Sequence, residues 1–297
     1  MIISASRRTD IPAFYFDWFL HRLHEGFVDV KNPFNRKQVS RISLKPSNVD
    51  CIVFWTKDPA PMLKRLEELS GYPFYVQVSI TPYEKDIETN LRSKREIIQI
   101  VQELSRYIGS KRVVWRYDPI LVNERYSLDY HLSWFENALE KLSPFVNQCV
   151  ISFIDIYPKI KKNIKNLNLH ELDEVVMQQL AFGFSELAKG SGIALSTCSE
   201  RIDLEKYKIS HGACIDKKLI ESITGKKLRV GKAKSQRPLC NCVESFDIGA
   251  YDTCIHGCHY CYANNSLQRA KLGFEQHDKV STCLVGRLLG DEKITMH

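Results

Sequence analysis

Three cysteines near the carboxyl end of this 297-residue chain have a spacing suited to metal chemistry. They lie in the segment Cys254-Ile-His-Gly-Cys258-His-Tyr-Cys261. Gly257 permits a tight turn, so the three thiolates can converge from one compact loop. Three thiolates on a four-iron cluster leave one iron open to a cofactor or substrate, whereas a structural zinc ion usually takes four protein ligands. The spacing therefore favours an iron–sulfur cluster.

The chain has seven more cysteines, four of which could form a second site. These four are Cys198, Cys214, Cys240 and Cys242. Their number fits an auxiliary iron–sulfur cluster or a zinc ion, but their spacing does not choose between them. Alternatively, the first two are small buried residues and the last two are exposed. Of the other three, Cys51 and Cys149 lie in apolar runs and are expected to be buried structural thiols, while Cys283 has no motif around it.

The elements that must position these thiols are predicted from an alternation of β-rich runs and amphipathic stretches. Apolar runs separated by helices are typical of a parallel sheet covered on both faces. Strands are predicted at residues 2–6, 51–55, 74–81, 113–117, 149–156 and 193–197. Helices are predicted at about residues 14–25, 58–71, 94–109, 128–142 and 172–189.

We therefore expect an α/β fold in which residues 1–200 form a partial (β/α)6 TIM-like barrel. An open, doubly wound sheet is the alternative. Residues 201–297 should form a basic connector and a cysteine-rich iron–sulfur segment packed on that core. In both architectures, chemistry belongs at the carboxyl ends of the strands.

Polar and charged side chains occur where several predicted strands end. Charges in such a place are costly unless paired, so these groups form either a ligand site or a structural ion network. Basic groups could hold a carboxylate, and acidic groups could hold an amine or a ribose. The candidates are Arg7, Arg8, Thr9, Asp10, Thr56, Lys57, Arg116, Asp118, Ser199 and Glu200, together with Asp155 inside the fifth strand.

Composition narrows the class of protein. The chain is 44% hydrophobic and 26% charged, which excludes disorder and leaves enough apolar residues for a large core. No stretch approaches the ~20 apolar residues of a membrane span, and Arg7 and Arg8 come too early for a secretory signal. We expect a cytoplasmic protein without structural disulfides. The net charge of +7 permits an anionic partner without identifying one.

The cysteine spacing, with Tyr260 in the aromatic place, resembles the Cys-x-x-x-Cys-x-aromatic-Cys signature of the radical S-adenosylmethionine (SAM) superfamily. There the motif usually follows the first strand, a place held here by Ser6-Arg-Arg-Thr-Asp10. The chain also resembles, along nearly its whole length, an uncharacterised bacterial domain-of-unknown-function family with such a cluster near its carboxyl end. Residues 4–10, 54–57, 116–119 and 240–264 carry this second resemblance.

The resemblance implies that Cys254, Cys258 and Cys261 bind a [4Fe–4S] cluster whose open iron chelates SAM. An enzyme of this type would need an electron donor such as flavodoxin or ferredoxin, and its substrate and catalytic residues are not indicated. Residues expected to contact the cofactor are Tyr260, Arg7, Arg8, Asp10, Thr56, Lys57, Arg116, Asp118 and Glu200.

A non-catalytic alternative is an iron–sulfur or zinc-stapled module that binds nucleic acid through the basic runs at residues 159–165 and 226–237. Most runs of this kind are solvated surface, and no zinc-finger or RNA-recognition pattern accompanies them. Walker, Gly-x-Gly-x-x-Gly and Gly-x-Ser-x-Gly motifs are also missing from the sequence, which weakens the nucleotide-triphosphate, dinucleotide and hydrolase interpretations.

Overall fold

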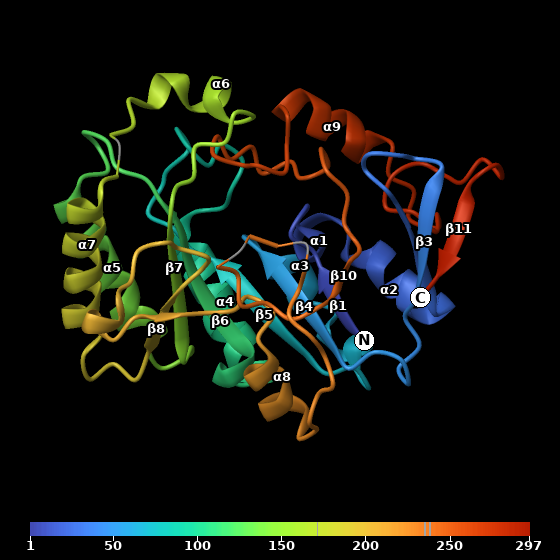
Figure 1. Ribbon diagram of the computed structural model, residues 1–297, viewed down its shortest axis with the longest axis horizontal. Helices are drawn as coiled ribbons and strands as arrows, with labels where there is room; N and C mark the ends of the chain where they lie inside the picture. The colour runs from blue at the N-terminus through green and yellow to red at the C-terminus, as the bar shows by residue number, and fades with distance from the viewer. Residues whose placement is uncertain (171, 235, 238) are drawn as a thin grey trace.

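An eight-stranded parallel sheet forms the centre of the computed structural model, which describes residues 1–170, 172–234, 236–237 and 239–297 (Figure 1). Six of its strands neighbour one another in chain order, and a short strand is added at each edge. In spatial order they are β10 (Phe246–Asp247), β1 (Ile2–Ala5), β4 (Cys51–Thr56), β5 (Phe74–Ser79), β6 (Val113–Ile120), β7 (Gln148–Phe153), β8 (Ala194–Thr197) and β9 (Ser210–His211).

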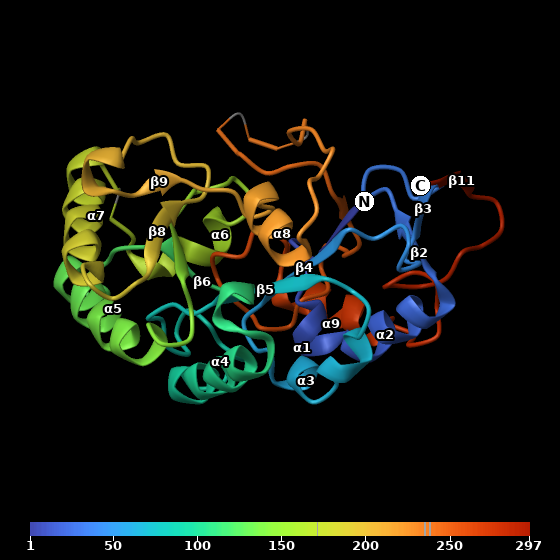
Figure 2. The ribbon, with the colours of Figure 1, turned by 90° about the horizontal axis from the view of Figure 1, so that it is seen from below.

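The connecting helices gather on one face of this sheet. Strands that follow one another in chain order through right-handed crossovers place their helices on the same side. Figure 2 shows α2 to α5 and α7 on one side and α8 on the other. The helices are α1 (Ile11–Phe14), α2 (Phe16–Glu25), α3 (Ala60–Leu63), α4 (Lys94–Ile108), α5 (Leu128–Leu142), α6 (Lys161–Ile164), α7 (Glu174–Ala188), α8 (Lys217–Thr224) and α9 (Leu267–Glu275).

Alternation along the strands divides the core into two layers. Successive side chains of a strand point to opposite faces of the sheet. Ile52 and Phe54 of β4 belong to the large core that also contains the helices. Their neighbours Cys51 and Val53 pack instead with Ile220 of α8 and with the segment that follows it. We call this second side the inner face. It is covered by residues from the last third of the chain.

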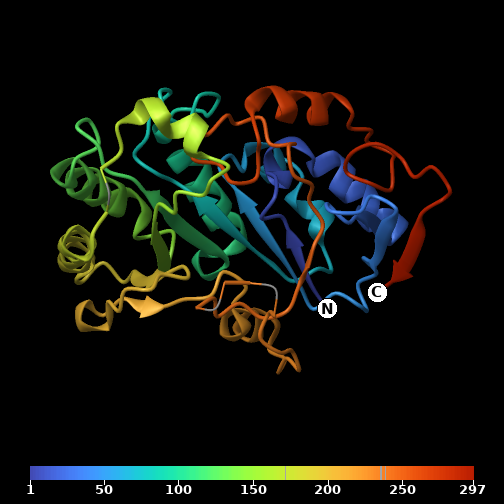
Figure 3. The same cartoon turned by 45° about the horizontal axis from the view of Figure 1, so that its top comes forward.

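The inner face becomes polar toward the carboxyl ends of the strands. On β5 the inward series passes from Tyr75 to Gln77, and on β6 it passes from Val114 to Arg116. Figure 3 shows α6 and α9, the yellow-green and red-orange helices, on the side toward which the strand arrows point. The apolar part of each strand therefore fixes the sheet, and its last residues place polar groups at the end expected for chemistry.

A small second sheet and two side-chain hydrogen bonds hold the end of the chain against its beginning. The sheet has the order β11 (Lys293–Met296), β3 (Gln38–Ser43) and β2 (Phe27–Lys31). Tyr15 donates to the carbonyl of Thr253 at 2.7 Å, and Trp18 donates to that of Ser281 at 2.9 Å. Within the described ranges, no helix combines the length and apolar character needed to cross a bilayer.

The six predicted strands and the α/β class are confirmed, with differences at several ends. The predicted helix over residues 14–25 is broken at Tyr15 into α1 and α2. Asp118 lies inside β6, because that strand continues to residue 120, whereas Asp155 lies beyond β7, which ends at residue 153. The capping box at Ser93 was predicted correctly. The strands of the small sheet were missed.

Candidate functional site

The cysteine loop lies against the segment that follows β5. His259 donates its backbone N–H to Ile87 O at 3.0 Å, and Asn90 N–H donates to His256 O at 2.9 Å. Gly257 has φ +72°, in the left-handed region that favours glycine. Its conformation turns the chain between Cys254 and Cys258. The loop is thus held by backbone pairing at the carboxyl end of a central strand.

The three cysteines of this loop, Cys254, Cys258 and Cys261, are half-buried as whole residues, and their thiol groups are shielded from solvent. Burial raises the pKa of Cys258 to about 12 and also raises that of the other two thiols, whose mutual repulsion adds to the shift at Cys254. The thiols therefore keep their protons at neutral pH unless a metal ion displaces them.

Glu88 is the centre of a buried ion network beside the loop. Its carboxylate, which is shielded from solvent, accepts hydrogen bonds from Lys57 at 2.6 Å and Thr81 at 2.8 Å, and also from Lys94 and Tyr260. Burial raises the pKa of Glu88, but the two ammonium groups outweigh this effect and hold the pKa at about 2. Because Lys57 is committed to this pair, it is less available to a ligand than its position in the sequence suggests.

Asp10 is also committed, because it joins two strand ends to the loop. Its Oδ2 accepts hydrogen bonds from Lys57 N–H at 2.7 Å and from His256 Nε2 at 2.8 Å. Its Oδ1 caps α1 through Ala13 N–H. Thr56 has a similarly local role, since its hydroxyl accepts a hydrogen bond from Asp58 N–H at 3.0 Å. Both residues position the site rather than face a ligand.

His256 leaves one buried ring atom without a partner. The side chain is almost fully buried, and no hydrogen-bond partner for its Nδ1 is found among the described residues. The ring lies between two thiols in sequence and packs on Phe14, with ring centroids 4.6 Å apart. Buried polar atoms normally have a hydrogen-bond partner, so the Nδ1 atom of His256 fits a polar group bound within the cysteine loop.

Arg7 and Arg8 are the least committed of the candidate cations. Each approaches Asp247 only loosely, at 3.7 Å and 3.9 Å, and each keeps part of its side chain exposed. Asp247 is held by Ser4 and Ser6, whose hydroxyls donate at 2.6 Å and 2.7 Å. Tyr262, next to the last cysteine of the loop, donates to Arg7 O at 2.7 Å. The loop is therefore linked directly to the segment after β1.

Arg116 and Asp118 form a pair on the inner face. Arg116 is buried and also contacts Gln77 at 3.0 Å, while Asp118 accepts a hydrogen bond from Ser152 on β7. Glu200 lies further along, where it accepts Phe153 N–H at 3.0 Å. Burial raises the pKa of Glu200 to about 7. The inner face toward the carboxyl ends of the central strands thus carries the ion pair of Arg116 and Asp118, with the separate carboxyl group of Glu200 beyond it.

The four remaining candidate thiols come together in a second group. The Sγ atoms of Cys198 and Cys214 are 3.1 Å apart, Cys214 interacts with Cys242, and Cys242 interacts with Cys240. Cys51, Cys149 and Cys283 are buried elsewhere. No group of three or more His, Cys, Asp or Glu side chains in the described part of the chain forms a ready-made metal site.

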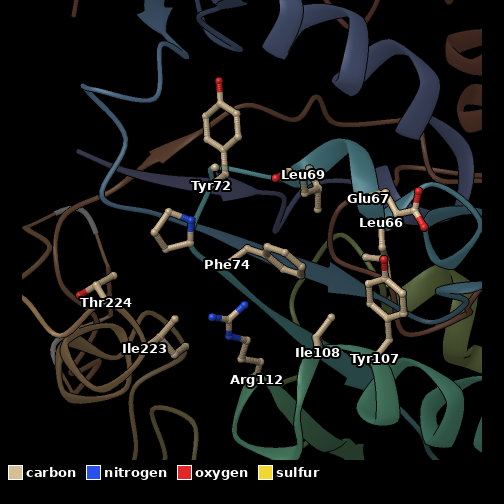
Figure 4. A pocket seen from close by; sticks show the side chains of 13 residues that line it. Leu66, Glu67, Leu69, Tyr72, Phe74, Tyr107, Ile108, Arg112, Ile223 and Thr224 are labelled. Atoms are coloured by element: carbon tan, nitrogen blue, oxygen red, sulfur yellow. The ribbon is translucent and has the colours of Figure 1, made fainter.

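Two hollows lie near the sheet. A groove of about 1430 Å³ extends from the strand ends and is lined in part by Arg8, Lys159, Tyr251 and Tyr262. A second cavity of about 760 Å³ lies at the opposite end of the sheet, around Phe74 at the start of β5 (Figure 4). Its labelled side chains are mostly apolar, and it lies at the other end of the strands from the Cys254 loop. The groove, which is lined by residues that flank this loop in the sequence, is therefore the better candidate for a ligand to approach the loop.

Several residues of the site were not predicted from the sequence. Glu88, Gln77, Ser152 and Asp247 contact candidate residues, and Lys94 pairs with Glu88. Inward alternation could have indicated Gln77, since it is polar within an apolar strand. Glu88 and Asp247 carry no such signal, because both lie outside the six predicted strands.

A comparison with protein families finds a match over most of the chain. The model described as Domain of unknown function (DUF1848) matches residues 2–263, and the chain belongs to this family. No curated protein and no solved structure matches the chain.

Proposed function

We propose that this member of the DUF1848 family is an iron–sulfur protein of the radical SAM type. Cys254, Cys258 and Cys261 would hold a [4Fe–4S] cluster, which supplies one-electron reductive cleavage of SAM when it is bound. The observation that carries the proposal is the position of the cysteine loop. It is fixed to the carboxyl ends of the central strands, next to an ion network that includes Lys57 and Tyr260.

The residues around the loop are consistent with this cluster. Three thiols on one loop leave one iron without a protein ligand. Beside them, the buried Nδ1 of His256 has no hydrogen-bond partner within the described part of the chain. The sheet would then be a partial barrel whose inner face holds SAM and substrate. The helices that connect its successive strands lie on one face, as the chain order of the strands requires (Figure 2).

The geometry divides the candidate cofactor contacts into three groups. Arg7 and Arg8 would bind the SAM carboxylate, because their contacts with Asp247 are long and leave hydrogen-bond donors available. Lys57 and Asp10 would instead hold the loop in place. Asp118 and Glu200 remain as acceptors for an amine or a ribose. An electron donor such as flavodoxin or ferredoxin would complete the system.

Anaerobic reconstitution tests this proposal. The protein should take up about four irons with matching sulfide at this loop, and with SAM and a strong reductant it should release 5′-deoxyadenosine. Cys258→Ala should lose that iron, whereas Cys283→Ala, which removes a buried thiol outside the loop, should keep it. The proposal fails if Cys258→Ala retains the iron of the wild type, or if an intact cluster never cleaves SAM.

A nucleic-acid-binding module is the second candidate, and the groove is the observation that favours it. Lys159 and Arg8 both lie over the Tyr251 ring, at 5.2 Å from its centroid, and Tyr157 lies 6.3 Å from Tyr262. Cations interleaved with aromatic rings can bind single strands by stacking and charge. A salt-dependent affinity for single-stranded RNA, lost in Lys159→Ala but unaffected by Cys258→Ala, would support this alternative.

A further inference from the structure

The second thiol group is assembled from three separate parts of the chain. Cys198 follows β8, Cys214 follows β9, and Cys240 and Cys242 come after α8. The group lies against the inner face, where Tyr75 donates a hydrogen bond to Cys214 O at 2.5 Å. Four sulfurs brought together over such distances in sequence are the donor set of a tetrahedral zinc site.

Hydrogen-bond donors are directed at these sulfurs. Arg116 Nη1 lies 2.9 Å from the Sγ of Cys214, and Ile215 N–H lies 3.3 Å from the Sγ of Cys242. A neutral thiol is a weak acceptor, so donors of this kind suit thiolates. Four thiolates on a divalent ion carry a net negative charge, and the guanidinium, which Asp118 partly neutralises, offsets some of it.

The separation of the sulfurs distinguishes a single ion from a cluster. Zinc–sulfur bonds of about 2.3 Å in a tetrahedron place the sulfurs about 3.8 Å apart. The 3.1 Å between Cys198 and Cys214 must widen by less than 1 Å, with side-chain rotations to surround one ion. A four-iron cluster would not fit between sulfurs that are so close.

We propose that Cys198, Cys214, Cys240 and Cys242 bind one soft divalent cation, most simply zinc, at a site independent of the Cys254 loop. The ion would fasten the segment after α8 to the ends of β8 and β9. This segment covers the inner face, so the ion would close one side of the space in which the proposed radical chemistry occurs. The site does not depend on that chemistry.

Metal analysis of the full chain, purified with reductant and without added metal, tests the proposal. The wild type should retain about one zinc per chain through dialysis, and Cys214→Ser and Cys242→Ser should lose it. Titration of wild-type thiols with a mercurial reagent should release the zinc, which keeps the test valid if a variant does not fold. Cys149→Ser is the matched control, because it removes a buried thiol outside the group.

A triple variant, Cys254→Ala, Cys258→Ala and Cys261→Ala, separates this proposal from the proposed function. It should lose the iron of the loop and keep the zinc. The inference is overturned if the wild type binds less than about 0.2 zinc per chain even after zinc is added. It is also overturned if Cys242→Ser retains the zinc of the wild type. Iron and sulfide that depend on Cys214, or a Cys198–Cys214 disulfide in the isolated protein, would also overturn it.

Discussion

Glu88→Gln should destabilise the protein far more than an ordinary loss of a salt bridge. The substitution keeps the size of the side chain but removes the negative charge that pairs with both Lys57 and Lys94. Both ammonium groups are nearly buried, and the carboxylate is fully shielded from solvent. Breaking a buried ion pair by removing one partner typically costs about 3–5 kcal/mol, because the remaining charge is left uncompensated.

An exposed ion pair of the same chain provides the matched control. Glu68 pairs with Arg65 at the surface, where both side chains are substantially solvated. Exposed pairs contribute about 0–1 kcal/mol, so Glu68→Gln should fall within that range. Urea unfolding followed by circular dichroism and by tryptophan fluorescence would give both free energies of unfolding. Equal, small losses for the two variants would refute the assignment of Glu88 as the organising charge of the site.

Two further predictions concern the support of the site. Burial lowers the pKa of His131 to about 4, so the stability due to its neutral ring, about 3 kcal/mol, should be lost as pH falls from about 6.5 to 4. The free energy of unfolding should therefore fall less steeply with decreasing pH in His131→Gln than in the wild type. Equal slopes for the two proteins would contradict this prediction. Gly273→Ala would place a Cβ 2.1 Å from the carbonyl oxygen of Asp252, so the melting temperature should fall by several degrees. Gly231→Ala, whose Cβ would meet Glu244 at an ordinary contact distance of 3.8 Å, should lose less, and equal losses would contradict this reasoning.

The fold was predictable where local pattern and burial agree. Apolar runs at β4, β5 and β7 predicted a parallel sheet, and the Ser93 capping box predicted the start of α4. The small sheet was not predictable in the same way. Its middle strand, β3, pairs with β11 from the far end of the chain, so its stability depends on contacts that no local window contains.

The candidate site shows the same division. Spacing alone predicted a compact Cys254 loop, and the end of the second predicted strand predicted where Lys57 would lie, whereas Arg116 lies inside β6. The acidic partners Glu88, which pairs with Lys57, and Asp247, which approaches Arg7 and Arg8, were not predictable. Both are placed by contacts between segments that are far apart in the sequence, such as that of Glu88 with Tyr260 and that of Asp247 with Ser4. Charge pairing of this kind depends on tertiary structure, and neither composition nor periodicity reports it.

The position of β10 beside β1 has a consequence for how the molecule is made. β1 is synthesised long before β10, yet one of its edges pairs with Phe246 and Asp247. The hydroxyls of Ser4 and of Ser6, which follows β1, donate hydrogen bonds to the same Asp247. A partly synthesised chain therefore exposes an open strand edge and contains no cysteine loop. Contacts between such distant residues form slowly, and unpaired edges invite association with other chains. Any cluster assembled on the loop would have to be delivered after β10 and the residues of the loop have been synthesised.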